Sequence, residues 1–165
     1  MKSVLILRHA KSSWKHPEQS DHERPLNKRG KRDAPLVGSV IKNENLLPEF
    51  VISSDAKRAS STAKMVAKAA GYRGEISFNK SLYEARPTAY IDVLHDLSNE
   101  YVRVLIVGHN PGVEELAGML TQEEHELSTC SLVHVKLTIN KWEELDYNTT
   151  GKLLGIWHPR DLTKG

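Results

Sequence analysis

The sequence is poor in cysteine, has almost no net charge and contains no long hydrophobic run. A single cysteine, Cys130, cannot form an intramolecular disulfide or a cysteine zinc cluster. A net charge of +2 is too small to indicate a nucleic-acid partner. The first apolar run, residues 4–7, is too short for a signal peptide or a membrane span. These absences predict a cytoplasmic protein with neither a membrane nor a nucleic-acid partner.

The length and the order of apolar segments predict a single α/β domain over residues 1–165. Apolar runs predict strands at 4–7, 50–52, 76–78, 102–107, 132–137 and 153–157. Helical periodicity predicts helices at about 27–42, 56–70, 87–97 and 113–120, although Pro35 conflicts with the first of these. The polar segment 10–25 is expected to be a long loop. Alternating strands and helices predict a three-layer α/β/α sandwich around a mainly parallel sheet.

Polar residues follow three of these strands at the point where each strand ends. Arg8 and His9 follow the first, 53–55 follow the second, and 108–112 follow the clearest strand. Arg58 falls in the first turn of the helix after the second strand. Parallel strands bring their carboxyl ends to one edge of the sheet, where ligands bind. We therefore expect these side chains to converge.

The converging residue types suit a phosphoryl group. Arg8 and Arg58 offer planar guanidinium groups that match a dianionic phosphate. A neutral imidazole at His9 is a nucleophile, and His109 stabilises the charge that develops. Taken alone, an Arg-His pair, a strand-to-helix turn with a histidine, or a helix arginine is more often an ordinary loop or surface feature. Their coincidence at separate strand ends favours catalysis, and the sequence offers no metal-ligand cluster and no phosphate-binding glycine loop.

The same residues resemble the histidine phosphatase superfamily, also called phosphoglycerate mutase-like. Its signature, Arg-His followed by a small residue after the first strand, matches 8–10. The SixA-type phosphohistidine phosphatases are the most similar subgroup. Their pattern is matched, in chain order, at 7–14, 21–30, 58–62, 82–85, 108–112 and 128–131.

This resemblance implies a covalent phosphohistidine intermediate without metal or cofactor. By position, His9 would be the nucleophile, and Arg8, Arg58 and His109 would complete the phosphate pocket. Arg24, in the long loop, would add a phosphate contact typical of the SixA-type group.

Several further residues are weaker candidates. Glu84 is our candidate general acid for the leaving group, although it is equally well explained as a surface glutamate. Asp55 is a weaker candidate for the same role. Ser12 and Asn110 are candidate substrate-binding residues. We expect Trp14 to pack rather than to shape access to the pocket. Cys130 is expected to pack as well, since nothing marks its thiol as activated.

Three functions fit these observations. The first is a SixA-like phosphatase acting on phosphohistidine in a protein. The second is a phosphomonoesterase or mutase acting on a small phosphorylated metabolite. The chain has no long insertion that would enclose a sugar phosphate, which favours the protein substrate. The third is a non-catalytic phosphate-binding module, which the presence of a nucleophile argues against.

Overall fold

The computed structural model describes residues 1–162 and contains one six-stranded sheet in the order β3-β2-β4-β1-β5-β6. The last three residues of the predicted domain, 163–165, lie outside the described residues. The strands are β1 (Ser3–Arg8), β2 (Phe50–Ser54), β3 (Ile76–Asn79), β4 (Arg103–Gly108), β5 (Leu132–Leu137) and β6 (Gly151–Trp157). Every predicted strand is present; β5 matches its prediction at both ends, and no other end differs by more than two residues.

The sheet is mainly parallel, as predicted. β3, β2, β4 and β1 pair in parallel, whereas β5 runs antiparallel to both β1 and β6. β6 therefore points in the same direction as the first four strands. In the register of β1 and β4, Arg8 lies opposite Gly108, so these two strands end side by side. β2 pairs with the other side of β4, which brings a third carboxyl end to the same edge.

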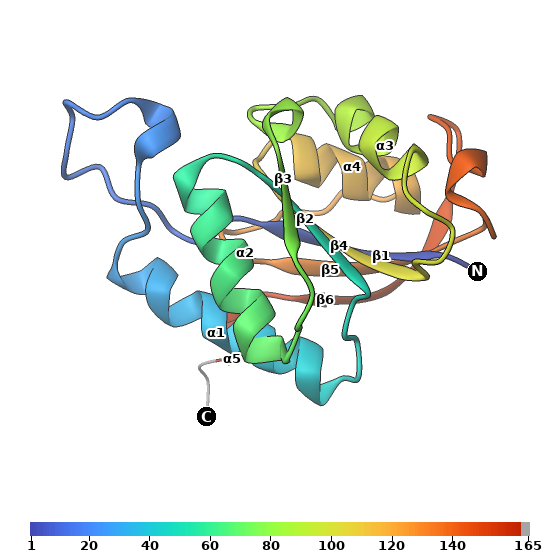
Figure 1. Cartoon of the computed structure of the whole chain (residues 1–165), viewed down its shortest axis with the longest axis horizontal. Helices are drawn as coiled ribbons and strands as arrows, with labels where there is room; N and C mark the ends of the chain where they lie inside the picture. The colour runs from blue at the N-terminus through green and yellow to red at the C-terminus, as the bar shows by residue number, and fades with distance from the viewer. Residues whose placement is uncertain (163–165) are drawn as a thin grey trace.

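Helices cover both faces of the sheet, which confirms the three-layer sandwich (Figure 1). α1 (Lys28–Asn43) and α2 (Lys57–Ala70) lie on one face, together with α5 (Pro159–Leu162), which contacts α1. α3 (Pro87–His95) and α4 (Gly112–Thr121) lie on the other. Short 3-10 helices occupy Asp21–Glu23, Lys80–Leu82 and Trp142–Glu144.

A hydrophobic core lies on each face of the sheet, and alternate side chains of the central strand β1 pack into one core or the other. Val4 and Ile6 pack in the core that includes α3 and α4, whereas Leu5 and Leu7 pack in the core that includes α1 and α2. All four are fully buried. Burial of each such side chain contributes roughly 1.5–3 kcal/mol. The strand that carries Arg8 and His9 at its end is therefore held rigidly from both faces.

Local sequence signals explain most helix boundaries. The Asn27 side chain accepts a hydrogen bond from the Gly30 N–H at 2.9 Å and caps α1. α2 ends at Gly71, whose φ of 85° suits a residue without Cβ. α1 continues through Pro35, as the periodicity predicted. One boundary was wrong, since α3 ends at His95 rather than at residue 97.

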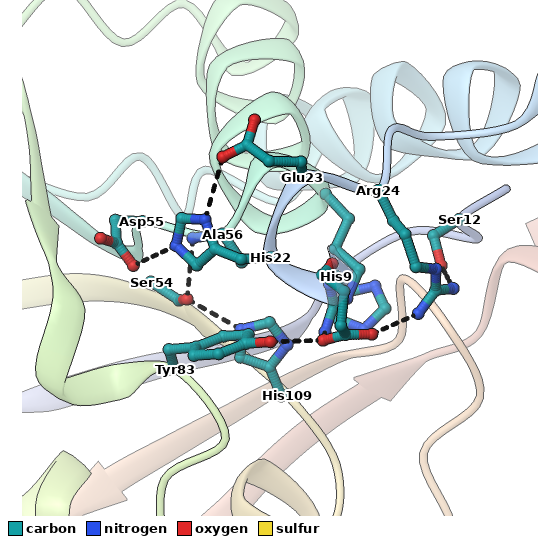
Figure 2. A network of polar contacts seen from close by, with 12 residues as sticks. His9, Ser12, His22, Glu23, Arg24, Ser54, Asp55, Ala56, Tyr83 and His109 are labelled. Carbon is teal, nitrogen blue, oxygen red and sulfur yellow. Dashed lines mark hydrogen bonds and ion pairs between the residues drawn. The ribbon is translucent and has the colours of Figure 1, made fainter. Parts of the chain in front are cut away.

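The segment 10–25 is more ordered than the predicted loop. Ser12 forms an antiparallel bridge with Leu26, and residues 21–23 form a 3-10 helix. The backbone N–H of Ser13 also donates to the Pro25 carbonyl at 2.8 Å. We call the whole connection between β1 and α1, residues 9–27, the β1–α1 loop. It folds back on itself and brings polar side chains to the end of the sheet (Figure 2).

Candidate active site

A pocket of about 220 Å³ lies at the carboxyl edge of the sheet. The five residues predicted to be catalytic and the three predicted to bind substrate all line this pocket: Arg8, His9, Ser12, Arg24, Arg58, Glu84, His109 and Asn110. The weaker acid candidate Asp55 does not line it. Lys11, Trp14 and Thr129 complete the lining. Residues from five separate parts of the chain therefore converge, as the strand ends predicted for three of them.

Backbone hydrogen bonds fix the end of β1 on both sides. The His9 N–H donates to the Gly108 carbonyl at 3.0 Å, which ties it to the end of β4. The Cys130 N–H lies 3.1 Å from the Arg8 carbonyl oxygen and 3.0 Å from that of His9. On the side of α2, the Thr62 hydroxyl accepts from the Ala10 N–H at 2.9 Å and donates to the Arg58 carbonyl at 2.7 Å. These contacts set the backbones of His9 and Arg58 relative to each other.

His9 is held as a neutral imidazole with a defined tautomer. Its Nδ1 lies 2.7 Å from the carbonyl oxygen of Ala10, and because a carbonyl can only accept, Nδ1 carries the proton. Burial is the main cause that lowers the pKa of His9 to about 3, and the positive Arg58 and Arg8 act in the same direction. At neutral pH, Nε2 therefore carries a lone pair, as a nucleophile requires.

His109 lies next to His9, with their ring centroids 5.2 Å apart. Its Nε2 is 2.8 Å from the Ser54 hydroxyl oxygen, and its backbone N–H donates to the Tyr90 hydroxyl at 3.1 Å. Burial, followed by the charge of Arg58, lowers the pKa of His109 to about 4. His109 is therefore also neutral at physiological pH.

Arg8 and Asn110 are positioned by the segment before β5. Arg8 Nη1 donates to the Leu127 carbonyl at 2.8 Å, and Asn110 Nδ2 donates to the same oxygen at 3.0 Å. Asn110 Nδ2 also donates to Glu114 at 2.9 Å, so both of its hydrogens are used. The buried Arg8 Nε and Asn110 Oδ1 have no hydrogen-bond partner within residues 1–162. Arg8 thus keeps donor capacity for an anion.

Asp21 joins the two remaining arginines of the pocket. Its Oδ1 accepts from Arg24 Nη1 at 2.8 Å, and its Oδ2 accepts from Arg58 Nη2 at 2.9 Å and from the Tyr83 hydroxyl at 2.5 Å (Figure 2 shows the bonds from Arg24 and Tyr83). Burial acts to raise the pKa of Asp21, but hydrogen bonds from Tyr83, Arg24 and Arg58 outweigh it and hold the pKa well below its usual value. Asp21 is therefore a fixed carboxylate.

Arg24 and Trp14 form the outer side of the pocket. Arg24 is buried, and its guanidinium donates to Asp21, to the Ser13 carbonyl and to the Ser12 hydroxyl. Its Cζ lies 3.2 Å from the centroid of the Trp14 ring. The expectation that Trp14 packs in the interior was wrong, because 72% of its surface is exposed. Trp14 covers the guanidinium and faces the solvent at the mouth of the pocket.

The two candidate acids occupy different positions. Glu84 is exposed, lines the pocket and has a φ of 50°. The turn that carries it is packed tightly, since a Cβ on Gly112 would lie 2.2 Å from the Ala85 carbonyl oxygen. Asp55 instead binds the His22 ring at 2.9 Å and raises the pKa of that histidine. Glu84 is therefore the better placed of the two.

Other groups near the site do not supply a metal centre or an activated thiol. Within residues 1–162, no group of three or more His, Cys, Asp or Glu side chains is arranged to hold a metal ion. Cys130 is buried, as expected, and burial raises the pKa of its thiol. No helix in this part of the chain is both long and apolar enough to span a membrane.

Sequence reasoning missed the residues that hold the pocket together. Asp21, Ser54 and Tyr83 each bond to a predicted site residue or to its partner, but none was nominated. Asp21 and Tyr83 fall within segments that resemble the SixA-type proteins, and Ser54 lies in the polar segment that follows a predicted strand. These locations were the sequence clues to a role in the site, but they do not reveal which side chains contact one another.

The sandwich fold and a pocket lined by two histidines and three arginines suit the binding of a phosphoryl group. A sequence model of the histidine phosphatase superfamily, branch 1, matches residues 4–90, and the chain belongs to this superfamily. An uncharacterized chloroplastic protein of Arabidopsis thaliana is 34% identical over 150 residues, which are 86% of this chain and 69% of that protein.

Solved structures share the whole fold. The protein histidine phosphatase SixA complexed with tungstate has a TM-score of 0.83 and 24% identity, covering 98% of this chain and 99% of that one. A mycobacterial glucosyl-3-phosphoglycerate phosphatase complexed with VO₃ has a TM-score of 0.70 and 14% identity, covering 96% and 99%. At these identities the likeness establishes the fold, of the phosphoglycerate mutase-like type that the sequence predicted.

Proposed function

We propose that this chain hydrolyses phosphohistidine in a phosphoprotein through a phosphohistidine intermediate on His9. The observation that carries this proposal is the hydrogen bond from His9 Nδ1–H to the Ala10 carbonyl. It fixes the tautomer that leaves a lone pair on Nε2, in a pocket lined by Arg8, Arg58 and His109. A phosphate-binding protein needs the cations but has no need for a neutral, oriented nucleophile.

The proposed reaction has two steps. In the first, Nε2 of His9 attacks phosphorus in line, the bond from phosphorus to the substrate nitrogen breaks, and that nitrogen leaves with its electron pair and takes up a proton. Arg8 and Arg58 neutralise the phosphoryl oxygens during transfer. In the second, water attacks phosphorus, gives up a proton and releases orthophosphate, which restores neutral His9. No metal or cofactor takes part in either step.

A protein substrate is supported by the shape and position of the pocket. The pocket holds only about 220 Å³, room for a phosphoryl group and a small part of its carrier. Exposed Trp14 stands at its mouth, where a protruding phosphorylated side chain would enter. The similar SixA structure is that of a protein histidine phosphatase. A single buried thiol fits the cytoplasm, where we place the reaction.

A small-molecule phosphomonoesterase or mutase is the second candidate. Glu84 lines the pocket and offers a carboxylic acid that would protonate an alkoxide leaving group. A leaving imidazole is less demanding, so an acid at this position favours phosphoesters. The similar mycobacterial structure is that of a glucosyl-3-phosphoglycerate phosphatase.

A substrate comparison tests the proposal. The purified chain is assayed for phosphate release from a phosphohistidine-carrying phosphotransfer domain and from a panel of phosphomonoesters, in parallel with His9→Ala. We expect kcat/KM to be highest for the phosphohistidine protein and no turnover of any substrate by His9→Ala. A higher kcat/KM for a small phosphoester would support the second candidate instead. Full activity of His9→Ala would contradict both.

A further inference from the structure

Ser54 is a fully buried residue at the end of β2 with an unusual pair of partners. Its hydroxyl oxygen accepts a hydrogen bond from the Ala56 N–H at 3.2 Å and lies 2.8 Å from Nε2 of His109 (Figure 2). Ser54 touches neither His9 nor an arginine of the pocket through any of these contacts. Of its two partners, only His109 lines the pocket.

The two possible tautomers of His109 leave different numbers of buried polar groups without a hydrogen-bond partner. If Nε2 carried the proton, it would donate to Ser54, and the serine hydroxyl hydrogen would need another acceptor in a fully buried place. If Nδ1 carries the proton, the Ser54 hydroxyl donates to the Nε2 lone pair while its oxygen accepts from Ala56. The second arrangement leaves one buried group of this pair without a partner, the Nδ1–H, whereas the first leaves two, the serine hydrogen and the Nδ1 lone pair. Unsatisfied buried polar groups are costly, so the second is favoured, and a phosphoryl oxygen in the pocket would satisfy its one remaining hydrogen.

The second tautomer also gives the pocket a further donor. His109 Nδ1 is buried and has no hydrogen-bond partner among residues 1–162. In Figure 2 the ring lies between Ser54 and His9, so the nitrogen not used by Ser54 faces the nucleophile. A lone pair there would repel a phosphoryl oxygen, whereas an N–H would donate to it.

We infer that Ser54 is a positioning residue that fixes His109 as the Nδ1–H tautomer, so that His109 donates a hydrogen bond to the transferring phosphoryl group. This inference rests on the proposed phosphatase reaction. The two histidines then hold opposite roles set by opposite partners. The Ala10 carbonyl, which only accepts, leaves His9 with a free Nε2, and the Ser54 hydroxyl, which donates, leaves His109 with a free Nδ1–H.

The ring nitrogens report the tautomer directly, without any turnover. In histidine-labelled protein at neutral pH, ¹⁵N NMR of the free enzyme should show His109 protonated at Nδ1 and unprotonated at Nε2. Ser54→Ala should lose this preference and give a mixture or the Nε2–H form. Wild-type His109 protonated at Nε2 would overturn the inference while leaving the nucleophilic role of His9 untouched.

Kinetics provide the second readout, with Ser53 as a matched control. Ser53 is also fully buried on β2, but its hydroxyl bonds to the Ser54 carbonyl at 2.9 Å. We expect Ser54→Ala to lower kcat/KM by about 10- to 100-fold, the usual effect of losing a donor to a charged group. Ser53→Ala should retain activity, and Ser54→Thr, which keeps the hydroxyl, should regain most of it. Equal losses in both alanine variants, with the His109 tautomer unchanged in Ser54→Ala, would mean a packing role only.

Discussion

The guanidinium of Arg58 donates two hydrogen bonds to Asp21. Arg58 Nη1 donates to the Asp21 carbonyl at 2.7 Å, and Nη2 donates to its carboxylate at 2.9 Å. Because the other carboxylate oxygen accepts from Arg24, one acidic residue orients two cations at the edge of the pocket. Charge-assisted bonds of this kind fix geometry as well as charge. Asp21 therefore ties the β1–α1 loop to the first turn of α2.

Replacing Asp21 with asparagine should weaken the hydrogen bonds that position Arg24 and Arg58. The change removes the negative charge and puts an amide NH₂ against a donor, so at least one bond to a charged group is lost. Such bonds are worth about 1.5–3 kcal/mol, which corresponds to a fall in kcat/KM of roughly 10- to 150-fold. Steady-state kinetics check this, with Asp55→Asn as the control because Asp55 pairs with His22. Wild-type kcat/KM in Asp21→Asn would show that the arginines need no such support.

Trp14 should matter for substrate affinity and little for stability. Its ring is largely exposed and covers the guanidinium of Arg24, so the fold loses little buried area when it is removed. Exposed cation–π contacts are worth about 0.5–1 kcal/mol, so Trp14→Ala should raise KM by roughly two- to fivefold and lower the melting temperature by no more than a few degrees. Phe78, an exposed aromatic on β3, provides the control as Phe78→Ala. A large fall in melting temperature for Trp14→Ala would indicate a structural role.

Glu84→Gln should separate the two substrate classes. The amide cannot donate a proton, so turnover of phosphomonoesters should fall by about 10²- to 10⁴-fold, the range for losing a general acid. Turnover of a phosphohistidine protein should change little, because its leaving nitrogen needs less assistance. The measurement is kcat for both substrates with the same enzyme preparation. If phosphoester turnover is unaffected, Glu84 has no part in the mechanism.

The buried histidines predict a loss of stability at mildly acid pH. Burial lowers the pKa of His9 to about 3 and of His109 to about 4, whereas both rise to about 6.5 on unfolding. Between pH 6.5 and 4 the unfolded chain binds more protons than the folded one. The free energy of unfolding should therefore decrease as the pH is lowered through this range, by up to about 1.4 kcal/mol per histidine per pH unit. His22, whose pKa Asp55 raises, acts in the opposite direction, but it is partly exposed and its effect is small.

Urea unfolding at several pH values checks this dependence. The double variant His9→Asn, His109→Asn removes both titrating groups, so its stability should vary less between pH 7 and pH 5 than that of the wild type. Equal pH dependence in the two proteins would mean that neither imidazole is held neutral by the fold.

Sequence patterns predicted the elements and the convergence of strand ends well. Buried aliphatic runs and helical periodicity depend on local spacing, and residues 4–7 and 102–107 identify adjacent strands whose ends carry His9 and His109. The convergence of Arg8, His9, Arg58 and His109 follows from that topology, because parallel strands end together, whereas Arg24 was implied only by the family resemblance. The catalytic roles of these side chains stay predictions.

The supporting contacts could not be predicted because they join residues far apart in the chain. Tyr83 and Asp21 are separated by 62 positions, and His109 and Ser54 by 55. No local pattern marks such a pair. The same limit explains the wrong expectation for Trp14, since a tryptophan in a polar loop gives no sign that a buried arginine lies beneath it.

Direct detection of phosphorylated His9 is the most decisive test of the mechanism. The enzyme is mixed with a phosphohistidine protein labelled in its phosphoryl group, quenched in alkali within the first turnover, digested and mapped by mass spectrometry. The mechanism predicts an acid-labile, alkali-stable phosphoryl group on His9, absent in His9→Ala. Turnover with no phosphoenzyme, or with the phosphoryl group on another residue, would contradict it.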